Sequence, residues 1–559
     1  MTNVLQLFKS TCSFSDEVKE RKSTPLRLLF GFLLAFLVLV FIYLSYTLIK
    51  PLNQHFNTPN GMVAKAYVAI LFSLLLISYI ILRINRKTNL EVDLFYIVLA
   101  SLLIKLVYML YTNGHTRQYD TWSSNHNGHY DYALYIYDHF SLPNHTFTEA
   151  NIYQFYHPPL YYYVAAIWMK IYSAIGFNKS LVTDTDALFC STQILITFFT
   201  YLISYYAVKT LRLVCKTKAG LYIGAVFVCF YPRLFQFSGQ INNDVLACLF
   251  VICSVFRLFK YIFDKKSYKN ICLSALYLGL AMCTKLSAVI VCLGYAAYFL
   301  FLLVRSIKKK EGEPSLKTVL IHYGLFLVIV APIGLWFQLY AHNVYGIPFN
   351  FVFRNLNPDL FTGTRNYVLA RSYLNVNSYD MHNEGLIYTN PFVNVLARYV
   401  SPFLVSDYAE RGVFAYAFGN YNILTYALKS TLFGEFSYWG GEGFGIVALL
   451  GAYIMWFTAI ALTIINIIKK RYDVSMIVSL GITLSVIVFY LYLQISMPYG
   501  CSMDARYIVP ILLPLGVLIV KNFEFMPHDN KLNKTLRYVL LFSTLTFAIG
   551  GGLFYCFAI

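Results

Sequence analysis

Charged side chains are scarce in this chain. Of its 559 residues, 13% are Asp, Glu, Lys or Arg and 58% are hydrophobic, whereas about a quarter of the residues of a soluble domain are charged. The mean hydropathy of +0.58 also excludes a soluble globular protein. No segment between the apolar runs is large enough to fold alone, and no repeat of about 20 to 50 residues is visible. We therefore expect one integral membrane unit over residues 27–557.

The chain also lacks a cysteine framework. Most of its 11 cysteines lie within apolar runs, where they behave as small hydrophobic side chains. Only Cys501 is expected in an outward-facing loop, and a lone cysteine forms no internal disulfide. No spacing of Cys and His is typical of a zinc site, and one carboxylate among scattered histidines is a poor ligand set for Mg²⁺. We predict no metal and no other cofactor, while the sequence leaves a divalent metal open.

Acidic residues are fewer than basic ones, 26 against 44, which makes the net charge +18. The basic residues gather in short segments between apolar runs, as in the cytoplasmic loops of membrane proteins. We therefore expect membrane lipids and no nucleic acid among the partners. The basic N-terminal segment, residues 1–26, precedes an apolar run that is too long for the core of a signal peptide, so it is predicted to be an uncleaved cytoplasmic tail.

Long apolar runs dominate what is present. Runs such as Leu28 to Leu48 and Ile446 to Ile468 match the roughly 20 residues that a helix needs to cross hydrocarbon, and the apolar runs together predict an all-α polytopic bundle of about thirteen spans. Placing every basic loop inside puts the C-terminus outside and makes the run 160–175 a helix in the outer interface. The predicted spans lie near residues 27–49, 62–82, 91–111, 190–208, 219–237, 245–263, 269–284, 286–304, 318–340, 443–467, 474–494, 507–520 and 537–557.

Two long loops face outward in this topology. One, residues 112–160, carries a cluster of acidic, amide and imidazole side chains. The other, residues 342–441, contains apolar stretches near 392–405 and 412–433, which leaves the number of spans uncertain by a pair. Polar groups held beside a bilayer are typical of a membrane enzyme that meets a lipid-borne substrate.

The unusual polar residues of the chain fall at this outer face. Each has an ordinary alternative: a solvated loop carboxylate, a loop histidine, a helix cap, or a cation that anchors a helix end. Their occurrence together favours a site. The candidate residues are Asp120, His129, His157, Asn243, Asp244, Lys285, Asp504 and Arg506, with His126 and Asp131 in the same first loop.

Chemistry at an outer face has no access to cytosolic ATP or nucleotide sugars, so an enzyme there needs a group that is already activated and carried across the bilayer. A sugar linked to a lipid phosphate meets this need. Its transfer requires a carboxylate to accept the proton of the acceptor hydroxyl and fixed positive charge to stabilise the departing phosphate. Asp120 can supply the first, and Lys285 and Arg506, with His157, can supply the second.

At these residues the chain resembles the GT-C glycosyltransferases, in particular the branch of the protein O-mannosyltransferases and the lipid A aminoarabinose transferases. The resemblance covers roughly residues 90–520. It rests on Arg117-Gln118-Tyr119-Asp120, on Phe155-Tyr156-His157-Pro158-Pro159-Leu160-Tyr161-Tyr162, on Asn242-Asn243-Asp244, on Thr284-Lys285-Leu286-Ser287 and on Met503-Asp504-Ala505-Arg506-Tyr507.

The resemblance implies a GT-C-like fold and an inverting transfer from a polyprenyl-phosphate sugar, with Asp120 as the catalytic base and the other candidates around the donor phosphate. Two features depart from the family. Two spans precede the one that normally leads into the catalytic loop, and the acidic pair of the protein O-mannosyltransferases is here Tyr119-Asp120. A glycan, lipid or cell-wall polymer is therefore favoured over a protein as acceptor, in a bacterial plasma membrane. His157 stands where the aminoarabinose transferases carry lysine, so a phosphate contact there would depend on pH.

Two other classes of protein remain as alternatives. A flippase or transporter of lipid-linked saccharides would also be large, basic on its inner loops and rich in aromatic residues. It would, however, need charges near the middle of the membrane, and the expected lack of such charges argues against this class. A polymerase or ligase of lipid-linked glycans would share the long outer loops and arginines such as Arg354, Arg365 and Arg371.

Overall fold

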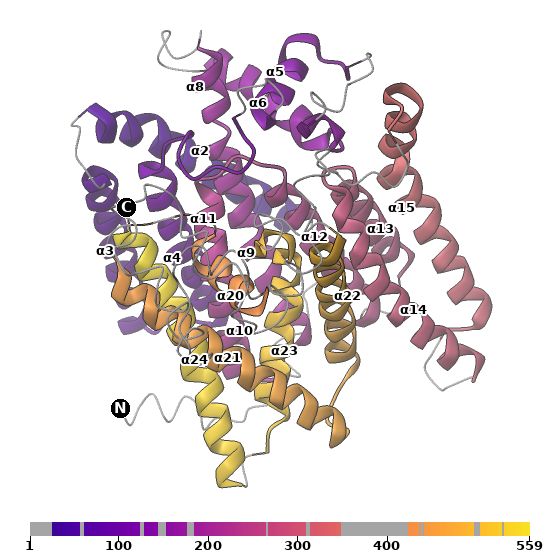
Figure 1. Cartoon of the computed structure of the whole chain (residues 1–559). Coiled ribbons are helices and arrows are strands. Elements are labelled where there is room, and N and C mark those ends of the chain that lie inside the picture. Colours follow the sequence, from indigo (N-terminus) through magenta and orange to yellow (C-terminus); the bar gives the residue numbers. More distant parts are fainter. Residues whose placement is uncertain are drawn as a thin grey trace, which may run out of the picture.

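The computed structural model describes residues 25–55, 61–122, 128–143, 153–175, 184–263, 267–308, 314–347, 423–434, 436, 438, 441–496, 504–527 and 530–558. Over these ranges every regular element is a helix and no strand occurs, as the sequence predicts (Figure 1). The helices share one large hydrophobic core. The predicted stretch 392–405, most of the loop 342–441, and the residues His126, Cys501, Arg354, Arg365 and Arg371 lie outside the described residues.

Eleven segments of the described chain are long and apolar enough to cross a membrane. Three of them join two consecutive helices each. The eleven are formed by α2 (Pro25–His55), α3 (Met62–Ile84), α4 (Leu90–Tyr111), α8 with α9 (Thr185–Cys190, Gln193–Val214), α10 with α11 (Lys218–Cys229, Pro232–Ser238), α12 (Asp244–Phe263), η3 with α14 (Leu286–Ile290, Val291–Ile307), α15 (Leu316–Tyr345), α21 (Glu442–Ile468), α22 (Val474–Ser496) and α24 (Lys531–Phe557).

The remaining two predicted spans are helices that are short for a crossing. They are α13 (Tyr268–Met282), with 15 residues, and α23 (Leu512–Phe525), with 14 residues. α13 nevertheless packs along α12 and returns the chain to the end where α12 begins, because Lys285 just beyond α13 contacts Asp244 at the start of α12. The multi-pass architecture is confirmed, and the count of thirteen stays a prediction.

Three short elements lie at one end of the bundle, at the top of Figure 1. They are α5 (His129–His139), η2 (Tyr153–Tyr156) and α6 (Leu160–Ile175), and α6 packs against both α5 and α8. α6 has 16 residues and is not among the eleven candidate spans. Its position above the bundle agrees with a helix at the interface, a placement that stays a prediction. The apolar stretch predicted near 412–433 ends in α20 (Ile423–Phe433), an 11-residue helix.

Proline determines one break that matters for the site. α10 ends at Cys229, and Pro232 occupies the first turn of α11, where its missing N–H costs no hydrogen bond. The chain therefore restarts as a short helix in a new direction. This bend carries Arg233 into the interior, where its side chain is fully buried.

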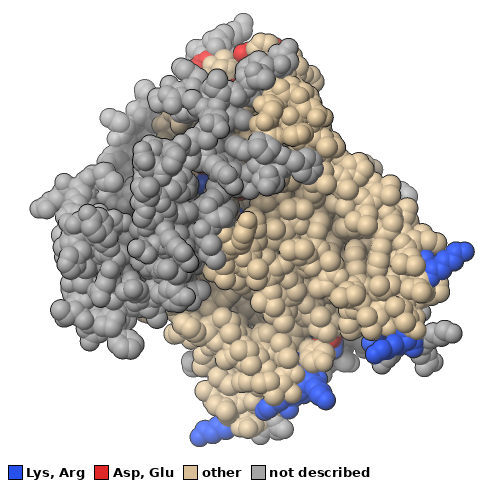
Figure 2. Space-filling view, turned by 45° about the vertical axis from the view of Figure 1, so that its right-hand side comes forward, with Lys and Arg blue, Asp and Glu red and all other residues tan. Residues whose placement is uncertain are grey.

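Charged side chains separate to the two ends of the molecule. In the view of Figure 2, Lys and Arg lie mainly along the lower and right-hand margin of the described surface, with a small acidic patch beside them, Asp and Glu also appear at the upper end, and a broad, largely uncharged belt lies between. Arg305 ends α14, Lys469 follows α21 and Lys531 begins α24, all at the end opposite α5 (Figure 1). This separation is what the positive-inside rule expects of a bundle that crosses a bilayer.

Candidate active site

The segment that carries Asp120 leaves α4 and crosses the end of the bundle in an unusual backbone conformation. Arg117 and Asp120 have φ values of 56° and 51°, in the left-handed region that side chains with a Cβ rarely adopt. Such a conformation persists only where its surroundings hold it. Here the Gln118 amide donates to the carbonyl of Gly239 at 2.9 Å and its oxygen accepts from the backbone N–H of Ile241 at 2.8 Å.

The start of α5 holds the same segment from the other side. The backbone N–H of His129 donates to the carbonyl of Asp120 at 3.0 Å, and the N–H of Tyr130 donates to the carbonyl of Thr121 at 2.9 Å. The Thr121 hydroxyl donates to the carbonyl of Ile241 at 3.0 Å. The carboxylate of Asp120 is therefore carried on a backbone fixed by two other parts of the chain.

Asp120 lies beside a buried cation. Nη2 of Arg506 is 3.4 Å from Oδ2 of Asp120, although the two residues are 386 positions apart. The Asp120 side chain is 34% exposed and that of Arg506 only 5%. The Asp120 carboxylate is thus partly accessible to solvent, whereas the Arg506 guanidinium is buried.

Aromatic rings and a short 3₁₀ turn position Arg506. It lies in η7 (Ala505–Tyr507), which is capped by the Asp504 side chain and followed by η8 (Val509–Ile511). The Arg506 guanidinium is 4.3 Å from the ring centre of Tyr119 and 5.0 Å from that of Tyr507, and it donates to the Tyr507 hydroxyl at 3.1 Å. Cation–π contacts on two sides leave the guanidinium little freedom.

A second cation also lies near the ring of Tyr507. Nζ of Lys285 is 5.0 Å from the Tyr507 ring centre and forms an ion pair with Asp244. Burial lowers the pKa of Lys285, and the positive charge of Arg506 adds to this, while Asp244 opposes it. The predicted residues Lys285, Asp244 and Arg506 therefore come together around one tyrosine.

These three charged residues line a narrow cavity of about 30 Å³. The rest of its wall is largely apolar and comes from α12, η3, α14, α22 and η8. The apolar lining consists of Ala247, Cys248, Val251, Ala288, Ile290, Val291, Val486, Phe489 and Pro510. The cavity thus joins a charged end to a hydrocarbon-like wall between candidate spans.

The two predicted histidines are buried next to each other. Their rings are stacked with centres 5.9 Å apart, and Nδ1 of His129 is 2.7 Å from the Tyr162 hydroxyl. Burial lowers the pKa of His129 to about 4 and that of His157 well below its ordinary value, with Lys285 and Arg506 contributing to both shifts. Both imidazoles are therefore neutral at neutral pH, and His157 could contact a phosphate as a hydrogen-bond donor but not as a fixed positive charge.

Asn243 and Asp504 are placed behind the exposed surface of the site. The Asn243 amide donates to the carbonyl of Thr284 at 3.4 Å and so links the start of α12 to the turn before Lys285. The Asp504 side chain is fully buried and pairs with Arg233. These two residues support the cations and do not face the exposed carboxylate of Asp120.

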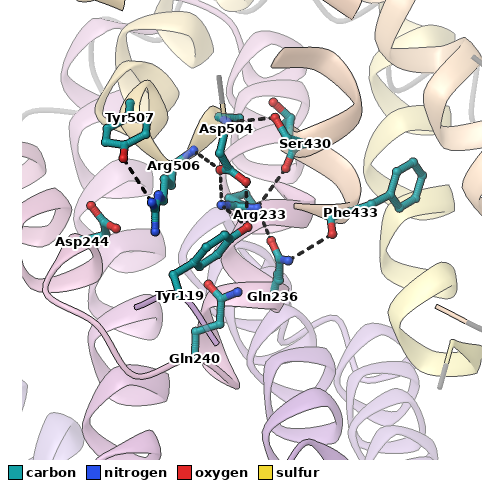
Figure 3. A network of polar contacts seen from close by, with 12 residues as sticks. Tyr119, Arg233, Gln236, Gln240, Asp244, Ser430, Phe433, Asp504, Arg506 and Tyr507 are labelled. Atoms are coloured by element: carbon teal, nitrogen blue, oxygen red, sulfur yellow. Dashed lines mark hydrogen bonds and ion pairs between the residues drawn. The ribbon is translucent and has the colours of Figure 1, made fainter. Parts of the chain in front are cut away.

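The sequence analysis did not single out Arg233, which lies at the centre of the polar network in Figure 3. Its Nη2 contacts Asp504 and donates to the Tyr119 hydroxyl at 3.1 Å, and the Tyr119 hydroxyl in turn donates to Oδ2 of Asp504 at 2.7 Å. Nη1 of Arg233 donates to the carbonyl of Ser430 at 3.0 Å, whose hydroxyl accepts from the N–H of Ala505 at 2.8 Å. An arginine inside the predicted span 219–237 was the signal that could have revealed this buried pair.

Basic side chains are present within the candidate spans, and the predicted lack of charge near the middle of the membrane stays a prediction. Lys105 lies inside α4 with a fully buried side chain, and its amino group donates to the carbonyl of Thr200 at 3.2 Å and to the Ser204 hydroxyl at 2.6 Å. Lys50 in α2 donates to the carbonyls of Thr112 at 2.9 Å and Met109 at 3.2 Å. Both lysines link their helices to neighbouring segments through neutral acceptors. A single lysine changes the mean hydropathy of a long apolar run only slightly, so hydropathy alone does not reveal it.

Comparison of the chain with protein-family models, with curated proteins and with solved structures finds no match. The function is therefore argued from the residues of the chain itself. The arrangement offers an exposed carboxylate, two buried cations beside it and an apolar wall, all at one end of a membrane bundle.

Proposed function

We propose that this protein is a membrane glycosyltransferase of the GT-C type. It transfers a sugar from a polyprenyl-phosphate donor to a glycan, lipid or cell-wall polymer, at the extracytoplasmic face of a bacterial plasma membrane. The observation that carries the proposal is the partly exposed carboxylate of Asp120 next to the buried guanidinium of Arg506, with Lys285 near the ring of Tyr507 that Arg506 also contacts.

The chemistry follows from the charges of these groups. The acceptor hydroxyl attacks the anomeric carbon while Asp120 takes its proton, and the bond between that carbon and the phosphate oxygen breaks with both electrons leaving on the phosphate. Configuration at the anomeric carbon inverts because the attack comes from the face opposite the leaving group. Arg506 and Lys285 stabilise the negative charge that grows on the phosphate.

The residues around the cavity support a lipid-linked donor by their chemistry. Lys285 and Arg506 are of the kind that binds a phosphate, and the apolar side chains from α12, α14 and α22 are of the kind that contacts an isoprenoid chain. The cavity of about 30 Å³ holds only a water-sized group, so the donor would enter only after its walls move apart. A water-soluble nucleotide sugar would gain nothing from such a wall. The separation of basic residues to the opposite end supports the placement of the site outside the cytoplasm.

A flippase or transporter, and a polymerase of lipid-linked saccharides, remain the alternatives to this proposal. Lys105 and Lys50 do place charge within the spans, yet their amino groups are engaged by carbonyl and hydroxyl groups of neighbouring helices. A transporter would move the lipid-linked sugar without cleaving it. A transferase releases polyprenyl phosphate, and this product separates the two classes of protein.

The test begins in cells that lack the protein. The lipid-linked sugar that accumulates there identifies the donor, and plasmid-borne wild-type protein should remove it while Asp120→Asn should not. Purified protein in sealed liposomes, given that donor and membrane acceptor, should then release polyprenyl phosphate. Transbilayer movement of the intact donor without release would overturn the proposal in favour of transport.

A further inference from the structure

A second cluster of chemically reactive side chains lies apart from the cavity described above. Nε2 of His115 is 2.9 Å from Oδ2 of Asp186, and these atoms and Sγ of Cys190 all lie within 4.8 Å of one another. His115 belongs to the segment that leads from α4 to Asp120, whereas Asp186 and Cys190 belong to α8. No sequence spacing could reveal this group, because 71 positions separate His115 from Asp186.

Neighbouring residues fix the approximate positions of His115 and Cys190. The His115 ring stacks on Trp122, with centres 4.0 Å apart and planes at 21°, and Trp122 donates to the carbonyl of Gly114 at 3.0 Å. A Cβ at position 114 would lie 2.3 Å from Sγ of Cys190, so glycine is required there for the thiol to approach the segment. These contacts bring the thiol of Cys190 close to the pair formed by His115 and Asp186, although the pair itself does not require the thiol.

We propose that His115, Asp186 and Cys190 bind a single divalent transition-metal ion, with zinc as the best match. Imidazole nitrogen, carboxylate oxygen and thiolate sulfur are the three ligand types that zinc takes in proteins. Zinc bond lengths place tetrahedral ligand atoms roughly 3.3 to 3.6 Å apart. The imidazole and the carboxylate must therefore separate slightly and the thiol must move closer, which side-chain rotation supplies.

Charge and exposure agree with this ion. The side chains of His115 and Asp186 are 47% and 41% exposed, so a water molecule can complete the tetrahedron. Binding releases the thiol proton of Cys190 to solvent, and one carboxylate with one thiolate then balances the two positive charges of the metal. The ion would link His115, which lies five residues before Asp120, to α8. It would not take part in the proposed transfer chemistry.

Metal content of the purified full-length protein tests the inference. The protein in detergent, equilibrated with buffered Zn²⁺ and then desalted, should retain about one zinc ion per chain, measured by mass spectrometry of the metal. His115→Ala and Cys190→Ser should each weaken binding by at least about 100-fold, since loss of even an outer partner costs about 10- to 100-fold. The matched controls are His139→Ala and Cys272→Ser, which remove the same residue types elsewhere and should leave the stoichiometry unchanged.

Cobalt provides a readout that does not depend on folding defects in the variants. Co²⁺ added to the wild-type protein should produce a thiolate-to-cobalt absorption band in the near ultraviolet, and Zn²⁺ should remove it. Asp186→Asn, which keeps a hydrogen-bonding oxygen opposite His115, should weaken the binding and retain the band at high Co²⁺. Wild-type protein that retains no zinc and shows no such band, or binding that is equal in His115→Ala and His139→Ala, would overturn the proposal.

Discussion

The guanidinium of Arg506 lies 3.4 Å from the carboxylate of Asp120 and stacks over the ring of Tyr119, the residue directly before that carboxylate. One side chain therefore touches both residues of the Tyr119-Asp120 pair. It orients the carboxylate toward solvent and at the same time presents positive charge to whatever anion comes near it. This arrangement makes the contributions of Asp120 and Arg506 separable by substitution.

Asp120→Asn keeps the size and the hydrogen bonds of the side chain but removes its ability to accept a proton. Turnover should fall by roughly 10² to 10⁴-fold, while donor binding persists. The release of polyprenyl phosphate by purified protein measures this. Asp138→Asn, a change to an exposed carboxylate in α5, is the matched control. Near-normal turnover in Asp120→Asn would remove Asp120 from the role of base.

Arg506→Ala and Lys285→Ala should weaken use of the donor by about one to three kcal/mol each, the range for a lost charge-assisted contact. The expected change is in kcat/KM for the lipid donor. Because Lys285→Ala also leaves Asp244 buried without its ion pair, the double variant Lys285→Ala/Asp244→Asn separates phosphate binding from stability. Lys308→Ala, at the opposite end of the bundle, should change nothing, and donor kinetics that match it in all variants would contradict the assignment.

The pair Arg233–Asp504 should dominate the stability of this end of the molecule. Both side chains are fully buried, so Asp504→Asn leaves an uncompensated guanidinium and should cost about 3 to 5 kcal/mol. Thermal unfolding in detergent measures the loss. Glu91→Gln breaks the more exposed pair with Arg212 and should cost less than about 1 kcal/mol. Similar unfolding midpoints for the two variants would show that the buried pair is not structural.

Acid should destabilise the protein through His129. Burial lowers its pKa from 6.5 to about 4. Between about pH 6.5 and pH 4, His129 is therefore protonated in the unfolded chain and neutral in the folded protein. Stability is then complete above this range and falls as the pH drops toward 4, by about 3 kcal/mol in total. His129→Gln should reduce this dependence in unfolding curves recorded from pH 7 to pH 4 but not abolish it, because burial also lowers the pKa of His157. His139→Gln, on the exposed side of α5, should leave it intact, and equal slopes for both variants would refute the role of burial.

The topology predicts opposite accessibility for the two ends of the bundle. A cysteine replacing exposed Asp138 should react with a membrane-impermeant thiol reagent in intact cells, and a cysteine replacing exposed Lys308 should react only after permeabilisation. Mass-tag gel shifts report both reactions. The reverse pattern would place the candidate site in the cytoplasm, without access to a donor presented outside.

The helices could be predicted from the sequence because hydropathy is a local property, and runs such as 62–82 and 91–111 coincide closely with α3 and α4. The length of a crossing was harder to predict. α23 is almost entirely buried and α13 packs against α12 and α15, so apolar composition alone does not show where they end.

The candidate site was predictable only as a list of residue types. Asp120, Lys285 and Arg506 stand out because charge beside an apolar run is unusual. Their support could not be foreseen: Arg233 and Asp504 meet across 271 positions, and the neutral state of His129 follows from burial that no sequence pattern encodes.

The contact between Tyr119 and Asp504 joins residues 385 positions apart, and this has a consequence for biosynthesis. In a chain inserted from its N-terminus, the segment that carries Asp120 reaches its end of the bundle long before the ribosome has made Asp504 and Arg506. Until then the Arg506 guanidinium that contacts Asp120 has not been made, and neither has Asp504, the counter-ion of Arg233. If Asp120 and Arg506 act together as proposed, the candidate site is incomplete until the residues after α22 have been made, and the same residues supply the counter-ion of Arg233.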